Sequence, residues 1–202
     1  HVPSPHKTIR TEVSAPYLDK RPLGGVYSVE KVPAAQQKDT ETLTLQIAKA
    51  IGITMGPYPC GVRQEMVADL FSEQAVLCSI IPEACKIAFE MLRSRGIPPE
   101  LAFFELWHEV GLIVQVMADK GPEAFFNLIS PNALIGAEKG RELMCGEEFH
   151  QKMGLLLREI ENGSFQKEVL KTDPTKLRQR TVGRWKDSEF GATIQRMQKG
   201  QP

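Results

Sequence analysis

The sequence predicts an all-α fold that follows a short extended segment, and three observations support this class. Proline and basic residues concentrate in residues 1–38, where the run Gly25-Val26-Tyr27-Ser28-Val29 alternates as a strand does. From Asp39 onward, apolar residues recur at helical spacing. No Gly-x-Gly-x-x-Gly motif and no strand–helix alternation of a nucleotide-binding fold occurs. We therefore predict an extended segment at 1–38 and a helical domain at 39–202.

Start and stop signals divide the helical domain. Proline suits the first turn of a helix and glycine suits the position after its end. On these signals helices are expected at about 39–51, 63–78, 82–96, 98–121, 131–144 and 147–162, with weaker periodicity at 165–170 and 185–197. Residues 54–61 contain two glycines and two prolines, which predict a loop.

Composition argues against several kinds of partner. Lys+Arg and Asp+Glu each count 25, so the formal net charge is zero and neither nucleic acid nor a membrane surface is predicted as a partner. No apolar run approaches the ~18 residues of a membrane span, and no secretory signal is visible. The four cysteines show no paired zinc spacing, so buried free thiols in a reducing cytoplasm are expected. They are Cys60, Cys78, Cys85 and Cys145.

Two pairs of carboxylates, each pair four residues apart, are the most informative feature of the chain. Asp69 and Glu73 form the first pair, and Glu105 and Glu109 form the second. A spacing of four residues places both members of a pair on one face of a helix. The first pair shares its face with polar residues, so a solvated face is an alternative to a functional site there.

The second pair lies on a helix that is apolar nearly all round, which predicts a buried helix. Burying unpaired carboxylates is costly, so these acids should be protonated, paired with a base or bound to a metal. No Lys or Arg occurs between Arg95 and Lys120, so local pairing is unavailable. A divalent cation is the simplest interpretation, and an ion pair with a distant arginine is the alternative.

Four motifs resemble those of the ketol-acid reductoisomerases. Residues 69–78 resemble D-L-F-G-E-Q-A-V-L-C, and Phe104-Glu105-Leu106-Trp107-His108-Glu109 with Leu112-Ile113-Val114 resembles F-E-C-L-H-E-x-x-L-I-V. Ile129-Ser130, with Asn132, Ala133 and Gly136, resembles I-S-N-T-A-E-Y-G, and residues 48–52 resemble A-K-A-I-G. The order and approximate spacing agree over about residues 5–200. The match is to the helical C-terminal domain of the short, bacterial-type enzymes.

This resemblance implies a magnesium-dependent alkyl migration in 2-acetolactate followed by reduction with NADPH, in branched-chain amino acid biosynthesis. Of the residues implied to hold two Mg²⁺ ions, Asp69 would bridge them and Glu73 would be the second ligand. Glu105 and Glu109 would serve metal binding and substrate contact, and Ser130 would hold the substrate carboxylate. Glu73 and Glu109 are the implied catalytic residues. Carboxylate oxygens are the ligands that hard Mg²⁺ prefers.

The resemblance also implies a knotted domain and a homodimer in which the acids of one site come from two subunits. The substrate would be a small 2-keto or 2-hydroxy acid, and the location cytoplasmic. NADPH would bind only through a nucleotide-binding domain that is missing from this chain. We therefore expect an isomerase and oxidoreductase whose present chain alone is inactive as a reductase.

Several residues depart from the family pattern. The basic segment P-K-G-P-G-H-T-V-R aligns only in part with residues 3–10, its lysine falls near Pro3, and Lys7 is displaced from it. The E-Y-G end of the serine motif is Leu134-Ile135-Gly136, and the G-G after L-C is Ser79-Ile80. The substrate pocket is therefore expected to differ.

Other interpretations of the same residues remain open. Glu105-x-x-His108 and Glu147-x-x-His150 are both motifs of di-iron carboxylate bundles. A non-enzymatic helical dimerisation module is a further alternative. For Ser130, which precedes a proline, the alternative to substrate contact is a helix N-cap. His108 lies one step from the acid pair on the helical wheel and is expected to be a core histidine rather than a ligand.

Overall fold

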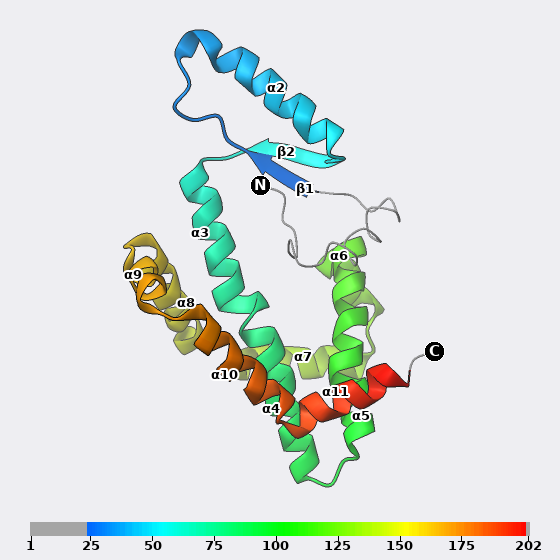
Figure 1. Ribbon diagram of the computed structural model, residues 1–202. Helices are drawn as coiled ribbons and strands as arrows, with labels where there is room; N and C mark the ends of the chain where they lie inside the picture. Colours follow the sequence, from blue (N-terminus) through cyan, green and yellow to red (C-terminus); the bar gives the residue numbers. More distant parts are fainter. Residues whose placement is uncertain (1–23, 201–202) are drawn as a thin grey trace. The chain divides into compact units, whose positions relative to one another are not determined.

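The computed structural model describes residues 24–200 and confirms the predicted helical class (Figure 1). In chain order its elements are β1 (Gly24–Tyr27), η1 (Ala34–Gln36), α2 (Gln37–Ala50), β2 (Met55–Pro59), α3 (Val62–Ser72), η2 (Glu73–Leu77), α4 (Ile80–Ser94), α5 (Pro99–Phe103), η3 (Phe104–His108), α6 (Glu109–Leu128), α7 (Pro131–Met144), α8 (Glu147–Glu161), α9 (Ser164–Lys171), α10 (Pro174–Lys186) and α11 (Glu189–Lys199). The chain divides into two compact units between Leu70 and Phe71. The boundary predicted after residue 38 and the predicted knot stay predictions.

The first unit contains two parallel strands joined by a helix. β1 pairs with β2, with Gly24 opposite Met55 and Val26 opposite Tyr58, and α2 provides the crossover that parallel strands need. β2 corrects the loop predicted over 54–61. A strand that lies at the edge of a sheet tolerates proline, because only one of its edges donates to the ladder. The strand expected near Val26 therefore has one paired edge within this chain.

The core of the second unit lies where α11 packs on α4 and α5. Its buried centre consists of Cys85, Phe89, Ala102 and Phe190. Cys85 and Phe89 are four residues apart in α4, so both lie on the face that meets α11. Burial raises the pKa of the Cys85 thiol. The buried state predicted for the free thiols is wrong for Cys78 and Cys145, which are exposed.

The apolar helix predicted to be buried is largely exposed. α5, η3 and α6 follow one another directly, and the predicted end near residue 121 is a kink at Gly121 (φ 80°, ψ 162°), after which helix resumes to Leu128. By length and composition alone, Pro99–Leu128 is apolar enough to cross a membrane. This corrects the expectation that no apolar segment of the chain is long enough for a membrane span. A helix whose apolar surface is covered by protein meets the same criterion.

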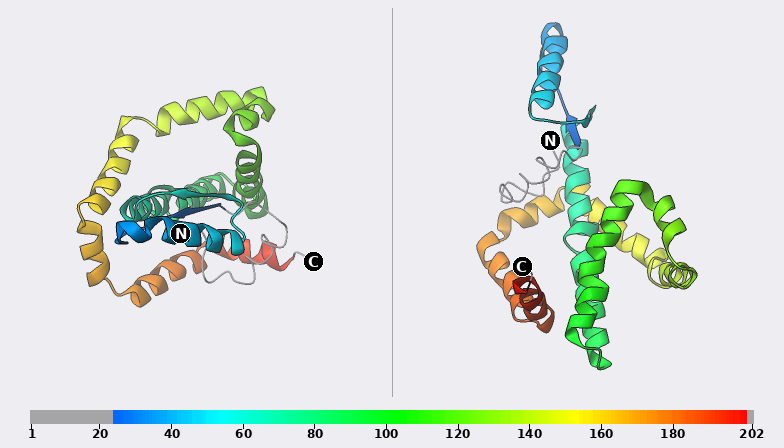
Figure 2. Two further views of the ribbon diagram at one scale, coloured as in Figure 1. Left: turned by 90° about the horizontal axis from the view of Figure 1, so that it is seen from above. Right: turned by 90° about the vertical axis from the view of Figure 1, so that its right-hand side faces the viewer.

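α7 has no buried residue, although it carries several large apolar side chains. Ile135 is 69% exposed, Leu143 82% and Met144 70%. At about 100° per residue, Leu134, Ile135, Leu143 and Met144 lie on all sides of this helix. Figure 2 shows α6 to α10 following one another in an open arc. Exposed apolar surface of this kind often marks a site of interaction, and on α7 it is not confined to one face.

Candidate functional site

The first acid motif contains a π-helical turn, η2. The Cys78 N–H donates to the Glu73 carbonyl at 2.9 Å, an i→i+5 bond that widens the helix. The Ser79 hydroxyl donates to the Gln74 carbonyl and so closes this turn. Ser79 stands where the family signature has glycine, so this departure has a structural role. π-Helical turns are rare and often occur at functional sites.

The acids of this motif lie on successive turns of one helical stretch. Asp69 is exposed in α3, four residues before Glu73, and belongs to the unit that ends at Leu70. Glu73 is half-buried and begins η2. Its neighbour Gln74 has a buried side-chain nitrogen without a hydrogen-bond partner among residues 24–200. An unsatisfied buried donor costs about 1–3 kcal/mol, so this amide lowers the stability of the fold at η2.

The second acid motif also contains a π-helical turn, η3. Glu105 lies within η3, and Glu109 is the first residue of α6. Both side chains are exposed, which corrects their predicted burial. The reason is that Leu106, Trp107 and Val110 take the side of the turn that packs against the core. Within the described chain, neither glutamate has the hydrogen bond or ion pair that the distant-arginine alternative requires.

The four acids suit a divalent cation in kind. Carboxylates are the oxygen ligands that Mg²⁺ prefers, and two such pairs could hold it. Residues 24–200 nevertheless contain no group of three or more His, Cys, Asp or Glu side chains that could hold a metal. No complete set of protein ligands is therefore gathered among residues 24–200. The same holds for the di-iron alternative, because Glu147 and His150 do not join Glu105 and His108 in such a group among the described residues.

Ser130 is the N-cap of α7. Its hydroxyl oxygen accepts from the Ala133 N–H at 3.2 Å, as the N-cap alternative requires. Substrate contact by Ser130 stays a prediction, and the hydroxyl hydrogen remains able to donate. His108 is exposed and lies edge-on to Phe104, with ring centroids 5.7 Å apart. The interpretation of His108 as a core residue is therefore wrong.

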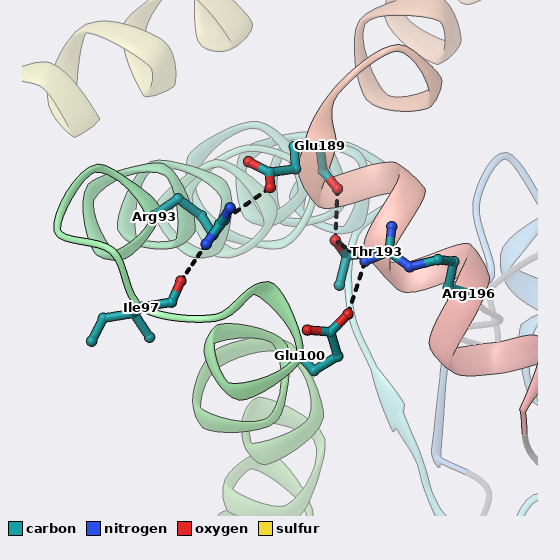
Figure 3. A network of polar contacts seen from close by, with 6 residues as sticks. All are labelled: Arg93, Ile97, Glu100, Glu189, Thr193 and Arg196. Carbon is teal, nitrogen blue, oxygen red and sulfur yellow. Dashed lines mark hydrogen bonds and ion pairs between the residues drawn. The ribbon is translucent and has the colours of Figure 1, made fainter.

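Sequence reasoning missed the polar contacts that hold α11 (Figure 3). Arg93 Nε donates to Glu189 Oε1 at 2.9 Å, and Arg196 Nη2 donates to Glu100 Oε1 at 3.1 Å. The backbone N–H of Glu100 and then Arg196 lower the pKa of the Glu100 carboxyl. Each pair spans 96 residues, so no local pattern could have found it. The basic segment at residues 3–10, with Lys7, lies outside the described residues.

The fold and its two acid motifs define a helical domain that bears carboxylates on π-helical turns. Comparison with known proteins identifies its family. Residues 62–200 match the family described as "Ketol-acid reductoisomerase, C-terminal domain". The chain therefore belongs to the ketol-acid reductoisomerase family, and this match confirms the resemblance drawn from the sequence motifs.

Individual relatives agree with this assignment. The chain is 37% identical over 155 residues to a ketol-acid reductoisomerase (NADP(+)) of Helicobacter pylori strain Shi470. The matched residues make up 76% of this chain and 46% of the relative. A relative from Methanocaldococcus jannaschii is 37% identical over 145 residues, covering 71% and 44%. A solved structure of an NADH-preferring ketol-acid reductoisomerase from an uncultured archaeon superposes with a TM-score of 0.85 at 28% identity. It matches 95% of this chain and 58% of that one. The chain thus spans about half the length of these relatives.

Proposed function

We propose that this chain is the metal- and substrate-binding part of a ketol-acid reductoisomerase that acts on 2-acetolactate-type acids in the cytoplasm. Together with a nucleotide-binding domain, it would carry out Mg²⁺-dependent alkyl migration and reduction by NADPH, in branched-chain amino acid biosynthesis. The relatives are named for NADP(+), whereas the solved neighbour is titled NADH-preferring. We propose NADPH for this chain, in keeping with the names of the relatives.

The observation that carries this proposal is the state of the acids on the two π-helical turns. Glu73, Glu105 and Glu109 have no ion pair in the described part of the chain. Unpaired carboxylates on or directly beside rare π-helical turns are poorly explained by stability, because like charges four residues apart repel. They are well explained by a cation that binds between them. With Asp69 they make the ligand set that we propose for two Mg²⁺ ions.

Each residue has a distinct proposed role. Bound Mg²⁺ would supply Lewis-acid polarisation of the substrate's ketone and hydroxyl oxygens. Glu73 and Glu109 would also hold or move protons at those oxygens, since a positioned carboxylate side chain can act as a general acid or base. Ser130 would donate its free hydroxyl hydrogen to the substrate carboxylate while its oxygen still accepts from Ala133.

A second copy of this chain is the partner that we propose to complete the site. One chain does not gather three ligands among residues 24–200, and α7 exposes apolar side chains on all of its sides. A symmetric pair of identical chains could supply ligands and cover at once, since each copy offers the same surface. A homodimer is preferred over a different protein because one interface would meet both needs.

Titration calorimetry of Mg²⁺ and Mn²⁺ on the 202-residue chain tests the metal site. Asp69→Asn and Glu105→Gln should abolish binding and leave the helical circular dichroism unchanged, because both acids are exposed. Glu123→Gln is a matched control, since Glu123 is an exposed acid of α6 outside both motifs. Unchanged affinity in Asp69→Asn would contradict the proposal.

An activity assay on the same chain tests the division of labour. Hydride transfer needs a nicotinamide held beside the substrate, and the sequence contains no phosphate-binding glycine motif to hold one. The 202-residue chain alone should therefore oxidise no NADPH with 2-acetolactate. Steady turnover by this chain would show that it contains a cofactor site of another kind.

The exposed apolar residues of α7 favour a second candidate function, a helical dimerisation module without catalysis. Such a module would form the dimer but would bind no divalent cation. A chain that dimerises but binds neither Mg²⁺ nor Mn²⁺ would support it over the enzyme domain.

A further inference from the structure

Four aromatic rings meet where the C-terminal helix crosses the rest of the second unit. Phe190 of α11 is 1% exposed and forms the centre of this aromatic cluster. Its ring centroid lies 4.7 Å from that of Phe89, 5.6 Å from that of Trp107 and 6.1 Å from that of Trp185. The contact with Trp107 is edge-to-face, at 86° between the ring planes, which is a favoured geometry.

Trp107 links this cluster to the acid pair. It belongs to η3 and lies between Glu105 and Glu109 in the chain. The turn therefore points its indole inwards, against Phe190, while both carboxylates are exposed. A π-helical turn is rarely stable by itself, so packing around it must select it over an ordinary α-helical turn.

The two ion pairs of α11 fix the helix in the direction along its axis (Figure 3). Glu189 at its start is held by Arg93 of α4, and Arg196 near its end is held by Glu100 of α5. Such exposed pairs contribute little to stability, and both are satisfied in the register that places Phe190 of α11 against Trp107. The register in turn determines which residue of α11 meets Trp107.

We propose that α11 positions the acid pair, with Phe190 and Trp107 as positioning residues for the divalent cation that Glu105 and Glu109 would bind. This proposal rests on the proposed function for the cation, but its structural part concerns only the π-helical turn. Trp107 stands where the family signature has leucine, so the indole and its contact with Phe190 are features of this chain rather than of the signature.

Amide hydrogen exchange on the 202-residue chain tests the structural part without any metal. Phe190→Leu and Trp107→Leu should each speed exchange at residues 104–109 by roughly tenfold or more, because the turn opens locally once its packing is removed. Exchange in α8 should not change. Trp107→Phe keeps an aromatic ring against Phe190 and should restore slow exchange. Phe126→Leu is the matched control, since Phe126 is a half-exposed ring of α6 outside the cluster.

Mn²⁺ titration of the same variants tests the link to the cation. Loss of a residue that orients a metal ligand typically weakens binding by about 10- to 100-fold, and we expect that loss in Phe190→Leu and Trp107→Leu. Trp107→Phe and Phe126→Leu should bind as the unchanged chain does.

The two readouts separate the two claims. Exchange at 104–109 that stays unchanged, or that rises equally in α8, overturns the positioning role whatever the metal affinity is. A second outcome is faster exchange at 104–109 in the variants, together with no Mn²⁺ binding by the unchanged chain. This outcome refutes the proposed metal-binding function, but it leaves intact the claim that packing of α11 stabilises the π-helical turn. If Phe190→Leu fails to fold, the comparison of Trp107→Leu with Trp107→Phe decides the matter.

Discussion

Replacing Ile135 and Leu143 of α7 by glutamine tests the second copy proposed as partner. The two side chains are 69% and 82% exposed in one chain, and they lie within about 80° of one another around the helix. Glutamine is a good helix former, so the double variant should keep α7 helical. It replaces apolar surface by polar surface at positions that a second copy would cover.

The size of the effect follows from the exposed area. Full burial of an aliphatic side chain contributes about 1.5–3 kcal/mol, so the exposed fractions of the two residues correspond to about 2–4.5 kcal/mol per subunit. Each position occurs twice in a symmetric dimer, which doubles the loss. Glutamine keeps part of its stem against the partner, so about half of the doubled value should be lost. A loss of about 2–4.5 kcal/mol raises the dissociation constant by about 30-fold to 2,000-fold.

Sedimentation equilibrium over a micromolar concentration range measures this change. The unchanged chain should be dimeric, and the Ile135→Gln/Leu143→Gln variant should dissociate within that range. The control is Leu43→Gln/Ile47→Gln on α2, which exchanges two aliphatic residues that are 56% and 53% exposed. A monomeric unchanged chain, or a double variant as tightly associated as the control, would refute the reasoning.

Three further predictions concern the second unit. Phe89→Ala should lower the free energy of unfolding in urea by about 3–5 kcal/mol, because Phe89 is fully buried against Phe190. Gly191→Ala should cost about 1–3 kcal/mol in the same assay, since a β-carbon there would lie 2.0 Å from the Trp185 carbonyl oxygen. Iodoacetamide should alkylate exposed Cys145 well before Cys85, whose thiol pKa burial raises.

Each of these predictions can fail in a definite way. A loss below about 1 kcal/mol for Phe89→Ala would mean that the core tolerates a cavity there. An unchanged midpoint for Gly191→Ala would mean that α10 and α11 can move apart without cost. Equal alkylation rates for the two cysteines, read by mass spectrometry of the digested chain, would show that α4 opens freely.

Local signals predicted most of the helices and the family. Ser130 followed by Pro131 marked the start of α7, and the helix predicted at 147–162 is α8, Glu147–Glu161. β2 was missed because glycine and proline dominate its residues, and its strand conformation depends on pairing with β1, about thirty residues earlier. Such pairing leaves no mark in the local pattern.

The sequence alone could not show that Glu105 and Glu109 are exposed in a single chain. An apolar helix indicates that something covers it, but the pattern does not say whether the cover belongs to the same chain. The π-helical turns were missed for a related reason. The Glu109 N–H donates to the Phe104 carbonyl, and the choice of this i→i+5 bond over i→i+4 bonding depends on how Trp107 packs against a helix more than eighty residues away.

The π-helical turn η3 also makes the chain sensitive to length at one place. An α-helix advances by about 100° per residue, so one deletion between residues 104 and 108 would turn α5 by that angle relative to α6. Even a deletion that spared Leu106 and Trp107 would rotate Ala102 and Phe103 out of the core, although no side chain of the core had changed. A relative that loses or gains a residue at this turn would need different residues on the side of α5 that packs on the core. Point substitutions at the turn leave the angle between the two helical faces unchanged.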